Sequence, residues 1–337
     1  MKKTMMLIGV AGMLFLTGCE VDEETPEQNE PKEKQKVTLS MGFIPNVQFA
    51  PFYIAQEKGY FAEQNLEVTF DYGMAPDLVQ LVGSGERQFA MTDGEQVLIA
   101  RSQEIPVRSV LQLYQEAPVS IVSLTESAIA KPEDLKGKKV GIPGLYGSSY
   151  TALLAYLAEQ QMTQDDIQLE SIGYTQVESL VSDVVDAVVV FTNNEPIQLR
   201  ERGYTINEFI VTDAVDYTGA ALITSEAMLA DDREIVEGVV RAIEQAMAYA
   251  IEHPEEAFEI SAAAIPDLAE ENYPVQRQVL TKSMELWQSE ATRENGLGYH
   301  NWEIWNATQR TLVNLELVPA DLDYREGFTN ELLSGEL

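Results

Sequence analysis

Asn193, Asn194 and Glu195 form a polar cluster directly after a strand-like apolar segment. The preceding residues 185–191 (VDAVVVF) are mostly β-branched and apolar, and a proline after the cluster opens a helix-like segment. One asparagine suffices to cap a helix, so two amides and a carboxylate offer more hydrogen-bonding groups than this turn needs. Such groups read the donor and acceptor edge of a flat nitrogen heterocycle, while aromatic rings sandwich its faces. The cluster therefore favours a ligand site; helix capping, with a carboxylate in the first turn, is the alternative.

Three other loops carry polar side chains after strand-like segments, at residues 45–49 (PNVQF), 92–95 (TDGE) and 141–149 (GIPGLYGSS). In open α/β sheets, ligands bind outside the carboxyl ends of the strands, where such loops and helix N-termini converge. The third loop lacks the GxGxxG spacing, so a dinucleotide site is unsupported. The candidate ligand-binding residues are therefore Asn46, Gln48, Phe49, Thr92, Asp93, Tyr146, Ser148, Ser149, Asn193, Asn194, Glu195 and Tyr217.

Each polar loop also has a purely structural interpretation. Asp93, Ser148 and Ser149 stand where residues cap helices, and Asn46 or Gln48 would satisfy local backbone groups. These alternatives stay open at the level of the sequence.

Aromatic residues accompany the same loops. Phe43, Phe49 and Phe52 surround the first loop, and Tyr146 and Tyr174 lie near later ones. Aromatic side chains dominate protein cores, so each phenylalanine alone is more typical of the core than of a cleft. As a set, the aromatic residues indicate stacking on the rings of a ligand.

The elements that position these loops follow an alternating pattern. From residue 36 onward, strand-like segments such as 36–43 (KVTLSMGF) alternate with helix-like segments such as 51–65 (PFYIAQEKGYFAEQN). This order is typical of open, mainly parallel sheets with helices on both faces. After Glu226 the pattern is nearly all helical, with a 3.6-residue apolar period at 234–253.

Two strand-like segments, 119–124 (VSIVSL) and 219–225 (GAALITS), have the character of crossings between two domains. The residues between them contain strands and helices enough for a domain of their own. We therefore expect one lobe from residues 37–124 and 225–330, and an inserted second lobe from residues 125–224.

The N-terminal segment has the features of a secretory signal. Residues 1–19 (MKKTMMLIGVAGMLFLTGC) contain two lysines, an apolar stretch too short to span a bilayer, and small residues before Cys19. Residues 16–19 (LTGC) resemble the bacterial lipobox, in which cleavage leaves the cysteine as a lipid-modified N-terminus. Because Cys19 is the only cysteine, disulfides and thiolate zinc sites are excluded. We expect a signal peptide at 1–18 and lipid anchoring on the extracytoplasmic face of the cell membrane; a chance cysteine after an ordinary signal is the alternative.

The segment that follows is acidic and lacks apolar periodicity. Residues 19–36 (CEVDEETPEQNEPKEKQK) therefore predict a disordered linker. The whole chain of 337 residues has a formal charge of −33, and a strongly acidic surface repels nucleic acid phosphates. We exclude nucleic acid as a partner.

Three segments resemble a known family: 42–73 (GFIPNVQFAPFYIAQEKGYFAEQNLEVTFDYG), 83–97 (GSGERQFAMTDGEQV) and 134–144 (DLKGKKVGIPG). In this order they resemble substrate-binding proteins of ABC importers in the thiamine-pyrimidine and alkanesulfonate-binding superfamily. The resemblance implies a type II periplasmic-binding fold, with two α/β lobes joined by two crossing strands. It also implies a monomer without a cofactor that delivers a small molecule to an ABC permease and its ATPase.

The first loop indicates which ligand the resemblance favours. Pyrimidine-precursor binders typically begin this loop with Asp-Trp-Tyr-Pro-Asn, whereas this chain has MGFIPN at 41–46. The longer segment 42–53 (GFIPNVQFAPFY) is more similar to riboflavin-binding members. We therefore expect a flat heteroaromatic vitamin, riboflavin first and a thiamine pyrimidine precursor second, with alkanesulfonate or nitrate as the alternative ligand class.

The residues needed for catalysis are sparse. Eukaryotic pyrimidine synthases of related fold use a histidine and a cysteine-rich motif, whereas this chain has only His253, His300 and a single cysteine. No Ser-His-Asp spacing or nucleophile elbow is present, and two distant histidines do not indicate a metal site. We expect a binding protein that is not an enzyme; a synthase-like enzyme and a structural lipoprotein are the alternatives.

Overall fold

The computed structural model describes residues 33–73 and 75–335. The expected signal peptide, Cys19 and most of the expected linker lie outside these described residues. Contacts join the described residues from Lys34 onward into one unit, within which the strands form two separate five-stranded sheets.

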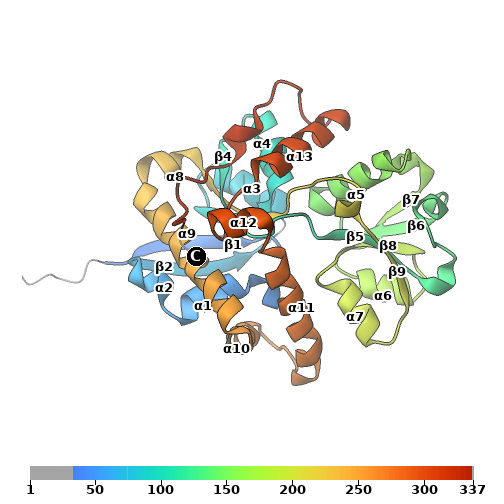
Figure 1. Ribbon diagram of the computed structural model, residues 1–337, viewed down its shortest axis with the longest axis horizontal. Helices are drawn as coiled ribbons and strands as arrows, with labels where there is room; N and C mark the ends of the chain where they lie inside the picture. Colours follow the sequence, from blue (N-terminus) through green and yellow to red (C-terminus); the bar gives the residue numbers. More distant parts are fainter. Residues whose placement is uncertain (1–32, 74, 336–337) are drawn as a thin grey trace, which may run out of the picture. The chain divides into compact units, whose positions relative to one another are not determined.

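The first sheet has the strand order β2-β1-β3-β10-β4 (Figure 1). Its strands are β1 (Gln35–Met41), β2 (Leu66–Tyr72), β3 (Phe89–Asp93), β4 (Val107–Gln112) and β10 (Ala220–Ser225). Strand β1 pairs in parallel with β2 and β3, whereas β10 runs antiparallel to β3 and β4. Four of the five strands therefore share one direction.

The second sheet repeats this arrangement in the order β7-β6-β8-β5-β9. Its strands are β5 (Val119–Leu124), β6 (Lys139–Ile142), β7 (Gln168–Ser171), β8 (Ala187–Phe191) and β9 (Ile206–Ile210). Strand β6 pairs in parallel with β7 and β8, and β5 runs antiparallel to β8 and β9. The expected α/β class with mainly parallel sheets is confirmed.

The two boundary strands belong to the opposite sheets from those expected. Strand β5 pairs only within the second sheet, and β10 is inserted between β3 and β4 of the first. We call residues 34–112 and 220–335 the first lobe, 119–210 the second lobe, and 113–118 and 211–219 the crossing segments. The expected boundaries were wrong here because β propensity locates a strand but does not reveal the sheet in which it pairs.

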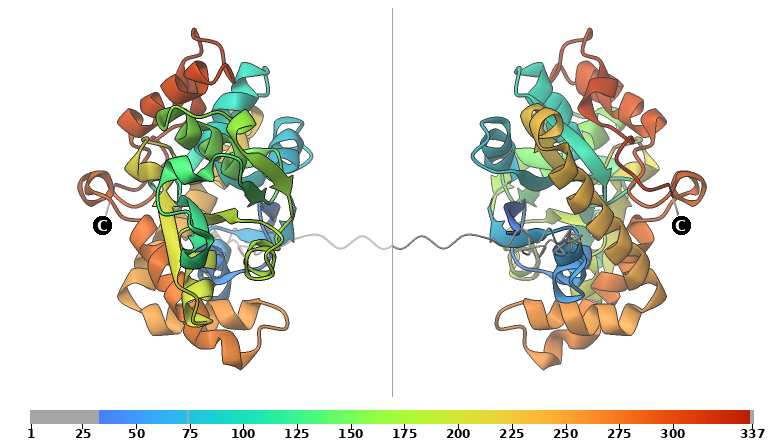
Figure 2. Two further views of the ribbon diagram at one scale, coloured as in Figure 1. Left: turned by 90° about the vertical axis from the view of Figure 1, so that its right-hand side faces the viewer. Right: turned by 90° about the vertical axis from the view of Figure 1, so that its left-hand side faces the viewer.

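Helices cover both sheets (Figure 2). The helices of the first lobe are α1 (Ala50–Glu57), α2 (Tyr60–Glu63), α3 (Ala75–Gly83), α4 (Gly94–Ser102), α8 (Glu226–Asp231), α9 (Arg233–Glu252), α10 (Pro254–Ala264), α11 (Tyr273–Leu286), α12 (Glu290–Asn295) and α13 (Trp302–Asn314). Those of the second lobe are α5 (Gly147–Glu159), α6 (Gln176–Val181) and α7 (Glu195–Glu201). Short 3-10 turns join them, including η1 (Val47–Phe49) directly before α1.

Alternate residues of the central strands pack against opposite helical layers. In β3, Phe89 and Met91 belong to the core formed with α1 and α9, whereas Ala90 belongs to the core formed with α3 and α4. In β8, Val188 and Val190 pack toward α6 and α7, and Val189 packs toward α5. Burial on both faces explains why such strands read as continuous apolar runs.

The C-terminal segment lies along β4, the edge strand of the first sheet. Ser109 of β4 pairs in parallel with Phe328, and the backbone N–H of Thr329 donates to the Ser109 carbonyl at 3.0 Å. The ring of His300 stacks on Phe328 with centroids 5.1 Å apart. The last described residues therefore cover an edge that would otherwise present unpaired backbone groups.

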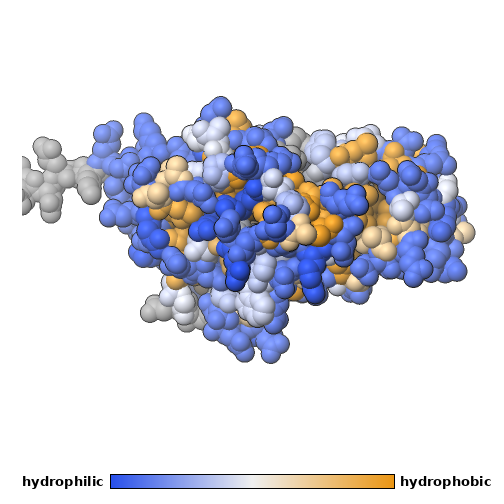
Figure 3. Space-filling view, turned by 90° about the horizontal axis from the view of Figure 1, so that it is seen from above, coloured by the Kyte–Doolittle hydropathy of each residue, from blue (hydrophilic) through white to orange (hydrophobic). Residues whose placement is uncertain are grey.

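Hydrophilic residues dominate the face seen in Figure 3, with hydrophobic residues in smaller patches between them. Helix α9 has 20 residues, but its apolar positions Val236, Val240, Ile243 and Met247 form one buried stripe. Within the described parts of the chain, no helix is both long enough and apolar enough to cross a membrane.

Candidate binding site

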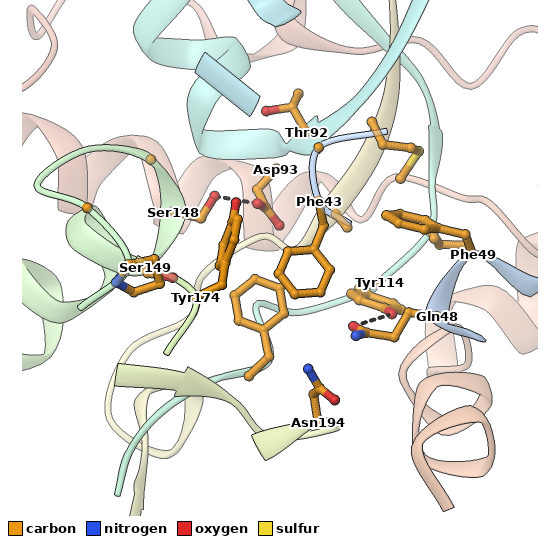
Figure 4. Close-up of a pocket in the computed structure, with 18 of the residues that line it drawn as sticks. Phe43, Gln48, Phe49, Thr92, Asp93, Tyr114, Ser148, Ser149, Tyr174 and Asn194 are labelled. Carbon is orange, nitrogen blue, oxygen red and sulfur yellow. Dashed lines mark hydrogen bonds between the residues drawn. The ribbon is translucent and has the colours of Figure 1, made fainter. Parts of the chain in front are cut away.

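A cavity of about 140 Å³ lies between residues of the first and second lobes (Figure 4). Its walls come from the loop after β1, the end of β3, the loop from β6 to α5, and the residues between β8 and α7. All four places follow the carboxyl ends of strands, which is where an open α/β sheet holds its ligands.

Nine of the twelve candidate residues line this cavity: Gln48, Phe49, Thr92, Asp93, Tyr146, Ser148, Ser149, Asn194 and Glu195. Loops separated by up to about 150 positions in the sequence therefore come together as the strand order predicts. The remaining three candidates, Asn46, Asn193 and Tyr217, are buried outside the lining.

Aromatic rings from both lobes enclose the cavity. Phe43 of the first lobe meets Tyr174 of the second edge to face, with ring centroids 4.7 Å apart and planes at 87°. Figure 4 shows both rings pointing into the same space, and Phe49 also lines it. Phe52, by contrast, is fully buried in the core of the first lobe. Rings arranged at different angles offer faces and edges to a flat ligand.

Asp93 and Ser148 form a polar wall where the two lobes meet. Asp93 ends β3 and accepts a hydrogen bond from the Ser148 hydroxyl in the first turn of α5. Although Asp93 occupies the N-cap position of α4, its side chain makes no capping hydrogen bond. Its Oδ1 atom is buried without a hydrogen-bond partner among the described residues. The capping interpretation is therefore wrong for Asp93, and the same holds for Ser148 and Ser149, which lie inside α5 after its N-cap Tyr146.

A second carboxyl lies behind this wall. Glu95 is fully buried and accepts hydrogen bonds from Gln96 Nε2 at 2.9 Å and Thr151 Oγ1 at 3.4 Å. Burial raises the pKa of both Asp93 and Glu95, and the neighbouring charge of Asp93 raises the pKa of Glu95 further. Glu95 belongs to the polar loop 92–95 but was not among the candidate residues, because a glutamate in the first turn of a helix usually faces solvent.

Asn194 and Glu195 form a polar wall at the start of α7. Glu195 Oε2 accepts from the backbone N–H of Phe191 at 3.0 Å, and Glu195 Oε1 accepts from Asn194 Nδ2 at 2.9 Å. Asn194 is at the N-cap position but makes no side-chain capping bond; its Oδ1 accepts from Gln198 Nε2 at 3.0 Å. Burial raises the pKa of Glu195. The carboxylate thus holds the turn in place, while both side chains face the cavity.

Asn193 joins the two lobes behind the cavity. Its fully buried Nδ2 atom lies 3.0 Å from Gln48 Oε1, 3.2 Å from the Tyr114 hydroxyl and 2.9 Å from Ser283 Oγ of α11. Its partner Gln48 lines the cavity, so Asn193 contacts the site from behind. We expected Asn193 to face a ligand, but the structure places it outside the cavity lining.

Asn46 and Tyr217 also lie outside the cavity. Asn46 Oδ1 accepts from the backbone N–H of Gln48 at 3.1 Å and caps η1, so the local interpretation is correct for this residue. Tyr217 belongs to a crossing segment and is fully buried, where burial and then the charge of Glu95 raise the pKa of its phenol.

Tyr114, Gln176 and Phe191 line the cavity but were missed in the sequence. Phe191 is the last residue of β8, and Tyr114 comes two residues after β4 ends. Their position at or just after the carboxyl end of a strand was the signal that would have found them. Gln176 opens α6, and no feature of its sequence context distinguishes it.

Neither histidine lies at the cavity. His300 is buried between Ser109 Oγ at 2.6 Å and Asn330 Oδ1 at 2.7 Å, and burial lowers its pKa to about 4. His253 follows the end of α9, half exposed. Within residues 33–73 and 75–335, no group of three or more His, Cys, Asp or Glu side chains is arranged to hold a metal ion.

Proteins named for binding small molecules are among those similar to this chain. A protein named riboflavin-binding protein RibY, from Chloroflexus aurantiacus, is 35% identical over 99% of each chain. A formylaminopyrimidine-binding protein from Halalkalibacterium halodurans is 28% identical, over 90% of this chain and 92% of its own. The solved aliphatic sulphonate binding protein SsuA from Escherichia coli has a TM-score of 0.69 at 17% identity, over 88% of this chain and 92% of that chain. It shows that the fold is that of periplasmic binding proteins.

Enzymes are also among the relatives. A 4-amino-5-hydroxymethyl-2-methylpyrimidine phosphate synthase from Legionella pneumophila is 25% identical, over 89% of this chain and 93% of its own. The family model described as NMT1/THI5 like matches residues 46–257. This range includes every residue that lines the cavity except Gly42 and Phe43. The chain belongs to the NMT1/THI5-like family.

Proposed function

We propose that this chain is the extracytoplasmic solute-binding lipoprotein of an ABC importer. It captures a flat heteroaromatic vitamin or vitamin precursor, riboflavin as first choice and a thiamine pyrimidine precursor as second. It then delivers this ligand to a membrane permease and its ATPase. The likeness over nearly the full length to a protein named for riboflavin binding supports the choice of ligand.

The observation that carries the proposal is the aromatic enclosure shared by both lobes. Phe43 and Phe49 come from the first lobe, Tyr114 from a crossing segment, and Tyr174 and Phe191 from the second. Such rings stack on a planar heterocycle, while neighbouring amides and carboxyls pair with its ring nitrogens and carbonyls. A ligand that contacts both lobes favours the closed arrangement, which a permease then distinguishes from an open one.

The composition of the cavity supports a neutral ligand over an anion. Among the described residues that line it, none is lysine, arginine or histidine, and two are carboxylic acids. Burying a sulfonate or nitrate costs free energy unless the anion is paired and hydrogen-bonded, and two carboxyls in the lining oppose it. The same lining offers no histidine for general acid-base chemistry, which supports binding without catalysis.

Titration calorimetry tests the ligand. We expect riboflavin to bind more tightly than the aminopyrimidine precursor, and both more tightly than an alkanesulfonate or nitrate. The Phe43→Ala variant should lose most of the riboflavin affinity, whereas Trp302→Ala, an exposed aromatic on α13 outside the cavity, should keep it. Tightest binding of the sulfonate or nitrate would sink the heteroaromatic proposal, and mass spectrometry of small molecules released from freshly purified protein gives an independent identification.

A further inference from the structure

The N-terminus of α5 opens directly onto the cavity. Gly147, Ser148 and Ser149 begin this 13-residue helix and all three line the cavity. A helix N-terminus with free N–H groups and hydroxyls attracts an anion such as a phosphate. At this end of α5, however, a carboxylate of the protein is already present.

That carboxylate is Asp93, which reaches across from the first lobe. Its Oδ2 atom accepts the hydrogen bond of Ser148, and Figure 4 shows the two side chains meeting beside Tyr174. Its Oδ1 atom is buried without a hydrogen-bond partner among the described residues, and the residue as a whole is only 8% exposed. Asp93 thus lines the cavity with one buried acceptor unpaired, and its carboxylate occupies the α5 end where an anionic ligand group would bind.

Among the described residues at the cavity, no cation offsets the charge of Asp93, and a second carboxyl lies beside it. Glu95 lies behind it, hydrogen-bonded to Thr151 one turn further along α5, and adds a second carboxyl to the same junction. The described side chains that line the cavity include no cation to offset either group.

We propose that Asp93 makes this site select the uncharged form of its ligand and reject the phosphorylated or sulfonated form. For a flavin ligand, riboflavin is accepted and riboflavin 5′-phosphate is rejected. This inference rests on the proposed function only in the identity of the heterocycle. An additional phosphate competes with the Asp93 carboxylate for the donors of α5 and is repelled by it, because like charges in a site with little water interact strongly.

The test compares dissociation constants for riboflavin and riboflavin 5′-phosphate at equal ionic strength. We expect the phosphate to bind about ten-fold to a hundred-fold more weakly to the native protein, as like-charge juxtaposition requires. Asp93→Asn keeps an acceptor for Ser148 but removes the charge, so the ratio of the two constants should fall by about ten-fold. Glu170→Gln, on exposed strand β7 and away from the cavity, removes one charge elsewhere and should leave the ratio unchanged.

Two results would overturn the inference: equal affinity of the native protein for both flavins, or an unchanged ratio in folded Asp93→Asn. If Asp93→Asn does not fold, Asp93→Ser provides the neutral site. The ratio of the two dissociation constants in the native protein still shows whether the phosphate is rejected. If neither flavin binds, the choice of flavin fails. The same comparison between 4-amino-5-hydroxymethyl-2-methylpyrimidine and its phosphate then tests the charge rule separately, and equal binding of that pair would refute it.

Discussion

Asn193 and Asn194 are neighbours in the chain, yet the structure predicts opposite effects for their replacement. Asn193 is fully buried and connects the second lobe to Gln48, Tyr114 and Ser283. Asn194 lines the cavity. We expect Asn193→Ala to lower thermal stability with little direct loss of ligand contacts. Asn194→Ala should chiefly weaken binding, and its stability should fall less because its own bonds to Glu195 and Gln198 stay within the start of α7.

The size of the Asn193 effect follows from its hydrogen bonds. The amide nitrogen carries two hydrogens, so at most two of its three neighbours accept at one time. Each neutral bond contributes about 1 kcal/mol net, which gives a loss of about 2 kcal/mol in the free energy of unfolding. For a chain of this length, this corresponds to a melting temperature lower by about 4 °C. The Ser283 hydroxyl adds little to this loss of stability, because it still donates to the Val279 carbonyl at 2.8 Å.

Differential scanning calorimetry and ligand titration on the same preparations measure both quantities. Asn193→Asp is a matched control of equal size, and it should destabilise more than alanine at neutral pH, because a carboxylate would face the Gln48 oxygen in a buried site. Asn194→Ala should lose about ten-fold in affinity, the value of one ligand hydrogen bond. If Asn193→Ala bound the ligand more weakly and kept its melting temperature, the reasoning would be refuted, and Asn193 would have to contact the ligand itself.

Three other outcomes are expected. Cys19→Ala should move the protein from the membrane to the soluble fraction without changing ligand affinity; fatty acid label still found on the variant would contradict this. Glu95→Gln should raise the melting temperature above that of the native protein, and by more as pH rises from about 5 to about 9. Burial raises the folded-state pKa of Glu95, so the native protein loses stability as pH rises through this range. A difference in melting temperature that does not change with pH would argue against this. Tyr174→Ala should weaken riboflavin binding about ten-fold through lost stacking, measured by calorimetry, whereas Tyr204→Ala, exposed in the same lobe but outside the cavity, serves as the control and should not.

The loops of the site could be predicted because their positions follow from strand order. Asp93 ends β3, and Ser148 and Glu195 come shortly after β6 and β8; parallel strands bring such positions to one edge. The sequence does not determine which side of a loop faces the cavity. Asn193 and Asn194 are the same residue type at neighbouring positions, and both are buried. Only the pairing of the second sheet and the position of α11 decide that Asn194 lines the cavity and Asn193 does not.

Aromatic residues were harder to assign for a related reason. Tyr217 and Tyr174 both lie near loops in the sequence, but Tyr217 is enclosed by the core that spans the crossing segments, whereas Tyr174 stays 38% exposed. The difference depends on contacts between segments more than 100 positions apart, which local patterns do not report. The assignment of β5 and β10 to sheets failed for the same reason, since an edge or central position is a property of pairing and not of propensity.

The edge of the first sheet has a consequence for the order in which the chain folds. The second lobe is one continuous stretch, 119–210, so its contacts are available as soon as that stretch has emerged from a ribosome or a translocation channel. The first lobe begins with β1 near residue 35, but it receives β10 only at residue 220, and Phe328 covers its edge only at the very end. A chain released N-terminus first would therefore assemble its inserted lobe first. The edges of β3 and β4 would stay unpaired until β10 and the segment around Phe328 have been made.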